Sequence, residues 1–181
     1  MTVPSRDAAA TQSATAIPST SDTSHRVNPR LRTLVPLRWG DMDAYGHINN
    51  VEVLRLLEEA RIRAFGSPAH TGSPVGEPLA PLFNELPQDA QALVVEHRVR
   101  YLASLEYRDV PAQIDVWVTQ LKGAGLTLAY EVRDGVDGTR CVIAETQLAF
   151  FDTGSNTLLR LTPQQRAKAA AHQDESPFRT P

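Results

Sequence analysis

The chain has 181 residues, of which 41% are hydrophobic and 22% charged, and its formal net charge is −3. This composition is typical of a soluble globular protein with one domain and some flanking chain, and the absence of a basic segment argues against nucleic acid as a partner. The single cysteine, Cys141, excludes an intrachain disulfide, and without a secretory signal or an apolar run of about 20 residues we expect a cytoplasmic protein with no membrane span.

Both ends of the chain lack a sustained apolar pattern. Residues 1–29 are rich in Ser, Thr and Ala, and they cannot bury enough apolar surface to offset the entropy lost on ordering. Residues 173–181 have the same character. We therefore expect a disordered N-terminal tail at 1–29, one folded domain at 30–172, and a disordered C-terminal tail at 173–181.

The domain is expected to begin with a strand over residues 31–39, followed by one long helix. Residues 50–65 contain neither Pro nor Gly, and their apolar side chains recur at helical spacing around most of the circumference. A helix that is apolar on most sides is a buried one, and Gly66 ends it. The Pro-rich segment 66–90 is expected to be a long loop with a short helical turn.

The rest of the domain is expected to consist of strands. Three segments alternate along the chain with a period of two, which indicates strands with one buried face: 93–101, 114–119 and 126–132. A fourth strand is expected over the longer stretch 142–151, which is apolar on most of both faces. Residues 123–125 and 134–138 carry the glycines of hairpin turns. Thr162 then opens a short helix, with Pro at its first position and Gln165 completing a capping box.

One buried helix and about five antiparallel strands predict an α+β fold in which the sheet wraps around the helix. Nothing else in the chain is available to cover the helix. Such a sheet leaves an edge strand with unpaired backbone groups. We therefore expect the chain to pair with further copies of itself.

The most informative stretch is 39–50, which reads as a strand end, an acidic turn and a helix start. Asn49 is a good N-cap, and Glu52 follows three residues later, as in a capping box. The amides of Asn50 and Val51 would then lack partners inside the helix. With the positive end of the helix dipole behind them, such amides can polarise a carbonyl and stabilise an oxyanion.

Asp43 lies in the acidic turn, a few residues before these amides. It could act as the general base for a water molecule, or it could attack a carbonyl itself. Asp and Asn residues before a helix also serve as turn and cap formers. From the residues alone, both interpretations remain open.

The motif resembles the signature of the 4-hydroxybenzoyl-CoA thioesterase family of hot-dog proteins. The matching letters are aromatic-x-Asp-x-Asp-x-x-Gly-His-x-Asn-Asn at 39–50 and Leu-Glu-Glu-Ala-Arg at 57–61, with weaker similarity over about 34–162. The resemblance implies a hot-dog fold and an acyl-CoA thioesterase. The motif does not specify the acyl group.

The resemblance also assigns roles to individual residues. The catalytic carboxylate of the family falls on Asp43, and the amide that polarises the thioester carbonyl falls on Asn50. The resemblance further marks Gly46 for close backbone approach to substrate, His47 as part of the catalytic motif, and Asn49 as a substrate-side or turn-forming residue. Glu59 is a reserve catalytic candidate, because some relatives use a helix carboxylate, although it could equally pair with Arg38 or Arg61.

The resemblance implies an acyl-CoA or acyl-carrier thioester as substrate, bound at the interface of a homodimer or homotetramer. It implies no metal and no redox cofactor. Candidate cations for the CoA phosphates are Arg98, Arg100, Arg108 and Lys122, because arginine in particular binds phosphate bidentately. Two alternatives remain: a hydratase or dehydratase acting on acyl thioesters, and a non-catalytic acyl-CoA-binding protein that keeps the fold.

Overall fold

The computed structural model describes residues 28–68 and 76–179. In chain order its elements are β1 (Leu31–Val35), a 3-10 turn (Trp39–Asp41), α1 (Asn50–Phe65), a second 3-10 turn (Phe83–Glu85), β2 (Ala90–Tyr101), β3 (Ala112–Lys122), β4 (Gly125–Arg133), β5 (Arg140–Asp152), β6 (Thr157–Leu158) and α2 (Pro163–Ala170). Within these ranges no helix is long and apolar enough to cross a membrane. The expected N-terminal tail falls almost wholly outside the described residues.

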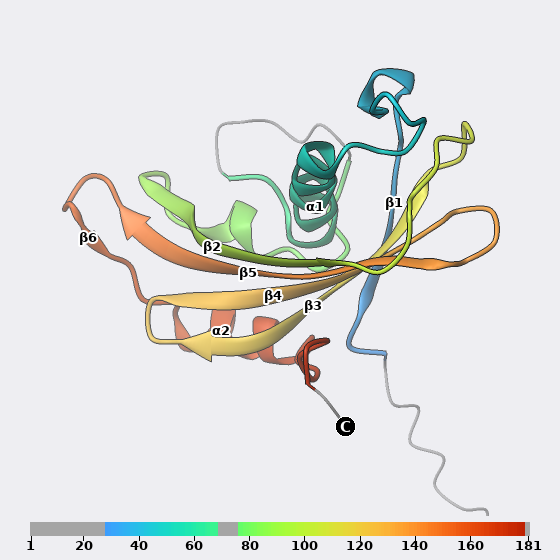
Figure 1. Ribbon diagram of the computed structural model, residues 1–181. Coiled ribbons are helices and arrows are strands. Elements are labelled where there is room, and N and C mark those ends of the chain that lie inside the picture. Colours follow the sequence, from blue (N-terminus) through green and yellow to red (C-terminus); the bar gives the residue numbers. More distant parts are fainter. Residues whose placement is uncertain (1–27, 69–75, 180–181) are drawn as a thin grey trace, which may run out of the picture.

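The strands form one antiparallel sheet in the order β1-β3-β4-β5-β2, and the short β6 pairs with β5. Figure 1 shows α1 against one face of this curved sheet, while α2 and the C-terminal segment lie on the other side. The predicted hot-dog arrangement, an antiparallel sheet wrapped around one long helix, is confirmed.

The core lies between α1 and the inner face of the sheet. One side of α1 buries Val53, Leu56, Leu57, Ala60, Ala64 and Phe65. Alternate residues of the strands meet them, among them Ile114, Val116, Leu128, Tyr130, Val142 and Leu148. The other side of α1 is partly exposed and carries Glu52, Arg55 and Glu59. The helix is therefore amphipathic, and the prediction of a helix buried on nearly all sides is wrong.

Two strand predictions need correction. The first strand ends at Val35 instead of residue 39, because Pro36 has no N–H to donate and a 3-10 turn follows. In β2 the register shifts between Val94 and Glu96, so Val95 is an extra residue in a β-bulge. The bulge reverses the order in which side chains alternate between the two faces of the sheet. Leu93 and His97 are four residues apart, which predicts a shared face, but they lie on opposite faces.

The C-terminal segment is ordered against the sheet up to residue 179, contrary to the disordered tail expected from residue 173. The backbone of Val118 donates to His172 and accepts from Asp174, both at 2.9 Å. The indole of Trp117 donates to the carbonyl of Glu175 at 2.8 Å. Trp117 lies on the outer face of the sheet, and its fully buried ring is covered by this segment.

Candidate functional site

Asp43 forms the turn that precedes α1. Its Oδ1 accepts the amides of Tyr45 at 2.8 Å and His47 at 3.1 Å, and its own amide donates to the carbonyl of His47 at 2.7 Å. Gly46 has a φ of 82°, a left-handed conformation in which glycine carries no steric penalty. One carboxylate oxygen of Asp43 thus has a turn-forming role. The other, Oδ2, makes no hydrogen bond to any residue that the structure describes.

The first turn of α1 leaves two amides open. Asn49 is the N-cap, as predicted, and its side chain accepts from the amide of Val51 at 3.1 Å. The predicted capping box does not form, because Glu52 pairs with Arg55 instead. The Val51 amide is therefore occupied. The amides of Asn50 and Glu52 have no acceptor within 28–68 and 76–179, so both are free donors at the positive end of the helix dipole.

Asp43, His47 and Asn50 line one cavity of about 440 Å³ between the start of α1 and the end of β2. Its remaining walls are mostly apolar: Ile48, Val53, Leu102, Ala103, Leu105 and Val142, with Tyr101 and Ser104. Ile48 ties the motif to the far wall by donating to the carbonyl of Leu105 at 2.8 Å. Asp43 and Asn50 therefore line one cavity whose other residues are mostly apolar.

Tyr101, at the end of β2, is a wall residue that the sequence did not single out. Its hydroxyl donates to the carbonyl of Asn50 at 3.1 Å, and partial burial raises the pKa of the phenol. The contact links the edge strand to the first residue of α1. No pattern in the sequence pairs these two residues, which lie 51 positions apart.

Glu59, the reserve catalytic candidate, does not line this cavity. It forms an ion pair with Arg55 and lies 3.7 Å from Arg38. Arg61 pairs with Glu58 at 2.5 Å instead. The structural alternative considered for Glu59, a charge neutralised by arginine, matches these contacts.

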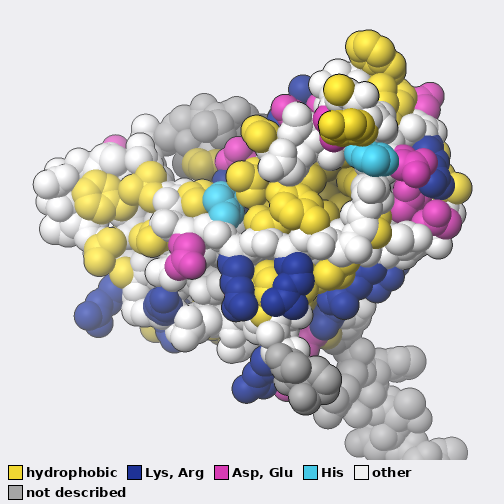
Figure 2. All heavy atoms as spheres, in the orientation of Figure 1, with side chains coloured by type: hydrophobic (Ala, Val, Ile, Leu, Met, Phe, Trp, Pro, Cys, Tyr) yellow, Lys and Arg dark blue, Asp and Glu magenta, His cyan; other side chains and the backbone are white. Residues whose placement is uncertain are grey.

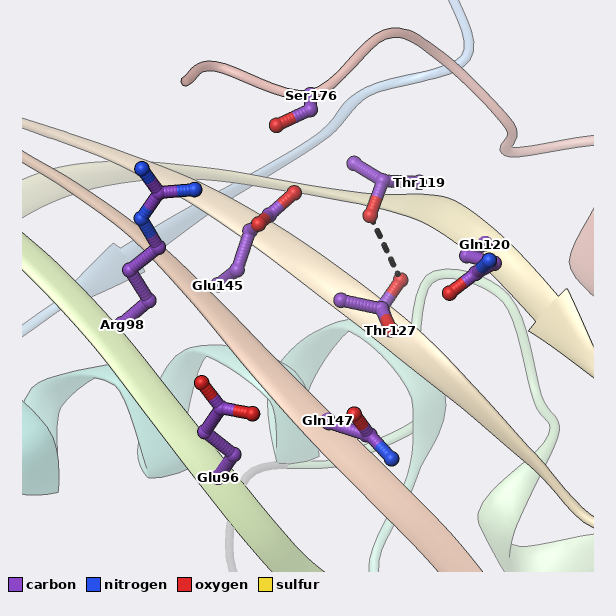
Figure 3. Close-up of a pocket in the computed structure, with 8 residues that line it drawn as sticks. All are labelled: Glu96, Arg98, Thr119, Gln120, Thr127, Glu145, Gln147 and Ser176. Atoms are coloured by element: carbon purple, nitrogen blue, oxygen red, sulfur yellow. Dashed lines mark hydrogen bonds between the residues drawn. The ribbon is translucent and has the colours of Figure 1, made fainter. Parts of the chain in front are cut away.

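Arg98 and Arg100, the candidate phosphate ligands on β2, point to the outer face of the sheet. Their guanidinium groups lie 4.0 and 5.3 Å from the ring centre of Phe178 in the C-terminal segment. Arg98 also lines a polar outer-face cavity of about 400 Å³, and Figure 3 shows it there beside Glu145 and Glu96. Neither arginine lines the cavity that contains Asp43.

Lys122 lies at the opposite end of the sheet from Asp43. Lys122 pairs with β4, which pairs with β5 and then with β2, and this row of paired residues ends at Leu93 of β2. The residue of β2 that lines the Asp43 cavity is Tyr101. At about 3.3 Å per residue, these two positions of β2 are roughly 26 Å apart. These cations were predicted from residue type, because arginine binds phosphate bidentately, and residue type does not place a side chain relative to the site.

No group of three or more His, Cys, Asp or Glu side chains that could hold a metal ion occurs in the described ranges. The residues that line the cavity carry a carboxylate (Asp43), an imidazole (His47), a phenol (Tyr101), a hydroxyl (Ser104) and the helix amide of Asn50. Together these can activate water and stabilise a negative charge on oxygen.

A sequence model of the thioesterase-like superfamily matches residues 37–175, which include the whole motif and the cavity. No curated protein matches the chain.

Solved structures share the fold at low sequence identity. A predicted thioesterase from Bacillus stearothermophilus is 17% identical, with a TM-score of 0.65 over 81% of this chain and 98% of that one. A thioesterase complexed with coenzyme A and zinc from Thermus thermophilus is 23% identical, with a TM-score of 0.61 over 81% and 95%. A DHNA-CoA thioesterase from Staphylococcus aureus is 19% identical, with a TM-score of 0.59 over 78% and 89%.

Proposed function

The chain belongs to the thioesterase-like superfamily, and from this premise we propose that it hydrolyses acyl-CoA thioesters at the cavity lined by Asp43 and Asn50. The observation that carries the proposal is the meeting of two features in one cavity. Asp43, whose Oδ2 has no hydrogen-bond partner in the described residues, and Asn50, whose amide is unpaired there, line the same space. Hydrolysis of a thioester needs a base or nucleophile and an oxyanion donor, and this cavity offers both.

In the proposed reaction the thioester carbonyl oxygen accepts a hydrogen bond from the Asn50 amide. Oδ2 of Asp43 takes a proton from water while the water oxygen bonds to the carbonyl carbon. The C–S bond then breaks, the thiolate of CoA leaves with the proton that Asp43 took from water, and the acid is released with Asp43 again ionised. Direct attack by Oδ2, giving an anhydride that water then opens, is the other route open to the same residue.

The lining of the cavity favours a neutral acyl group. Six of its residues are apolar, neither Lys nor Arg is among the residues that line it, and Asp43 contributes negative charge. A second carboxylate on the acyl group would be desolvated beside Asp43 without a cation to pair with. We therefore expect aliphatic or aromatic acyl groups to be preferred over dicarboxylic ones.

The proposed assembly is a homodimer that pairs along β2. Within the described part of the chain this 12-residue strand bonds only to β5, so one edge is open. Exposed apolar side chains lie along it: Leu93, Val94, Val95, Tyr101 and, just beyond, Leu102. In the orientation of Figure 1, Figure 2 shows hydrophobic side chains gathered in the middle of the viewed face, between α1 and β2. An open, apolar edge of this length is a site of pairing between chains.

A second candidate is a protein that binds acyl-CoA without hydrolysing it. One contact favours it: Oδ1 of Asp43 is bound by the amides of Tyr45 and His47, as in an aspartate that only forms a turn. On this alternative, the same cavity would hold the thioester and release no thiol.

The test is a thiol-release assay with the full chain on octanoyl-CoA, benzoyl-CoA, crotonyl-CoA and succinyl-CoA. The proposal expects free CoA from the neutral thioesters and a kcat/KM for succinyl-CoA at least tenfold below that for octanoyl-CoA. Loss of crotonyl absorbance without thiol would indicate hydration instead. Saturable binding of octanoyl-CoA by calorimetry with no thiol released would overturn hydrolysis and support the binding protein.

A further inference from the structure

Asp41, the first acidic residue of the motif, is buried between the β1–α1 loop and α1, with only 3% of its surface exposed. Its Oδ2 accepts the amide of Arg38 at 2.8 Å and Nη2 of Arg55 at 2.7 Å. Its carbonyl accepts the amide of Asn49 at 2.8 Å. One residue therefore ties the start of the loop, the end of the loop and the side of the helix together.

These contacts lie next to both of the proposed reactive groups. Asp43 follows Asp41 by two residues, and Asn50 follows the anchored Asn49 by one. The turn of Asp43 is closed by bonds to its own neighbours, which fix the turn internally but not its place relative to α1. The bond between Asp41 and Arg55, at 2.7 Å, is the shorter of two side-chain links between this loop and the body of the helix in the described residues.

Arg55 meets three carboxylates, and only one of them lies outside α1. Glu52 and Glu59 are on the same helix, whereas Asp41 is on the loop. Burial lowers the pKa of Arg55, but the bond to Glu52 and the charges of Asp41 and Glu59 outweigh it and leave the pKa above its ordinary value. A second link from loop to helix, Arg38 to Glu59, is longer at 3.7 Å and involves an exposed arginine, so it contributes little.

We propose that Asp41 and Arg55 are positioning residues that hold Asp43 and the Asn50 amide in register for thioester hydrolysis. This inference rests on the proposed function of the cavity. Neither residue lines the cavity, so their effect reaches the substrate through the loop. Because a displacement of about 1 Å can cost on the order of 100-fold in rate, we expect loss of the bond to lower kcat by roughly 10- to 100-fold. KM should change by less than about twofold, because no substrate contact is removed.

The experiment compares Asp41→Asn, Arg55→Gln and the double variant with Glu52→Gln as a matched control. Glu52 bonds to the same guanidinium at the same 2.7 Å, but it lies on the helix and does not touch the loop. Steady-state thiol release gives kcat and KM. Amide hydrogen exchange over residues 41–50 reports directly on the loop, and urea unfolding reports the stability of each variant.

The inference expects the two single variants to lose kcat to a similar degree and the double variant to lose little more. Amide hydrogen exchange over residues 41–50 should be faster in Asp41→Asn, Arg55→Gln and the double variant. Glu52→Gln should match the wild type in kcat and in exchange rate. An equal loss in Glu52→Gln, independent losses that multiply, or a kcat for Asp41→Asn within twofold of wild type would overturn it. Should Arg55→Gln fail to fold, Arg55→Lys keeps the charge, and the same kcat and exchange readings apply.

A failure of the proposed function can be told apart from a failure of this inference. The proposed function fails if the wild-type protein releases no thiol. In that case the exchange measurement still decides whether Asp41 fixes the loop to α1. Unchanged exchange in Asp41→Asn would then remove the positioning role as well.

Discussion

Replacing Asn49 with Asp is expected to separate stability from activity at the start of α1. The side chain of Asn49 accepts the amide of Val51 at 3.1 Å, and an Asp carboxylate can accept the same bond. A negative charge at a helix N-terminus is also favourable by about 0.3–1 kcal/mol. The Asn49→Asp variant should therefore be at least as stable as the wild type.

The same charge is unfavourable for the proposed chemistry, because negative charge develops beside it on the oxygen bound to the Asn50 amide. At a separation of about 6 Å, Coulomb's law gives about 0.7 kcal/mol in bulk water and about 2.8 kcal/mol at an effective dielectric constant of about 20. Since about 1.4 kcal/mol corresponds to tenfold in rate, kcat should fall by roughly 3- to 100-fold. The fall should shrink in high salt, which screens exposed charges.

The assay measures thiol release and urea unfolding on Asn49→Asp, with Asn49→Ala as the variant that loses the cap and adds no charge. Asn49→Ala should lose about 1 kcal/mol of stability. Thr162→Asp is the matched control, because it puts a carboxylate on the N-cap of α2, where Thr162 accepts from Gln165 at 3.2 Å. A kcat for Asn49→Asp equal to that of Thr162→Asp would show that no oxyanion forms at α1.

Three further outcomes test the fold. Gly125→Ala should destabilise by about 1–3 kcal/mol in urea unfolding, because its Cβ would lie 2.2 Å from the carbonyl of Leu148, whereas Gly123→Ala in the same hairpin meets nothing within 4 Å and should cost far less. Partial burial and a nearby arginine lower the pKa of His97 from 6.5, so the folded protein should lose stability as the pH falls below about 6.5, and His97→Gln should lose this dependence. Trp117→Phe loses a 2.8 Å bond to the C-terminal segment and should speed proteolysis of that segment and cost about 1 kcal/mol.

Local signals predicted the long helix to the residue. Asn49 caps its start, and Gly66 ends it with a φ of 95°, a conformation that favours glycine. Both features depend on neighbours in the sequence, and so does the turn at Asp43. This is why the helix limits and the turn at the heart of the site could be placed before the fold was known.

Features that depend on distant partners could not be predicted. The β-bulge at Val95 changed which residues of β2 face the core. Trp117 gave no local sign that the C-terminal segment would cover it. The bond between Asp41 and Arg55 joins residues 14 positions apart on different elements. Neither helical spacing nor strand alternation reports on such a pair.

Turnover of thioester by Asp43→Asn tests the central claim most directly. Asn keeps an oxygen that can accept the amides of Tyr45 and His47, so the turn survives while the charge on the free oxygen is lost. A general base of this kind contributes on the order of 10²- to 10⁴-fold, and kcat should fall by that factor with unfolding unchanged. A variant that folds normally and keeps more than a tenth of the wild-type kcat would contradict the role given to Asp43.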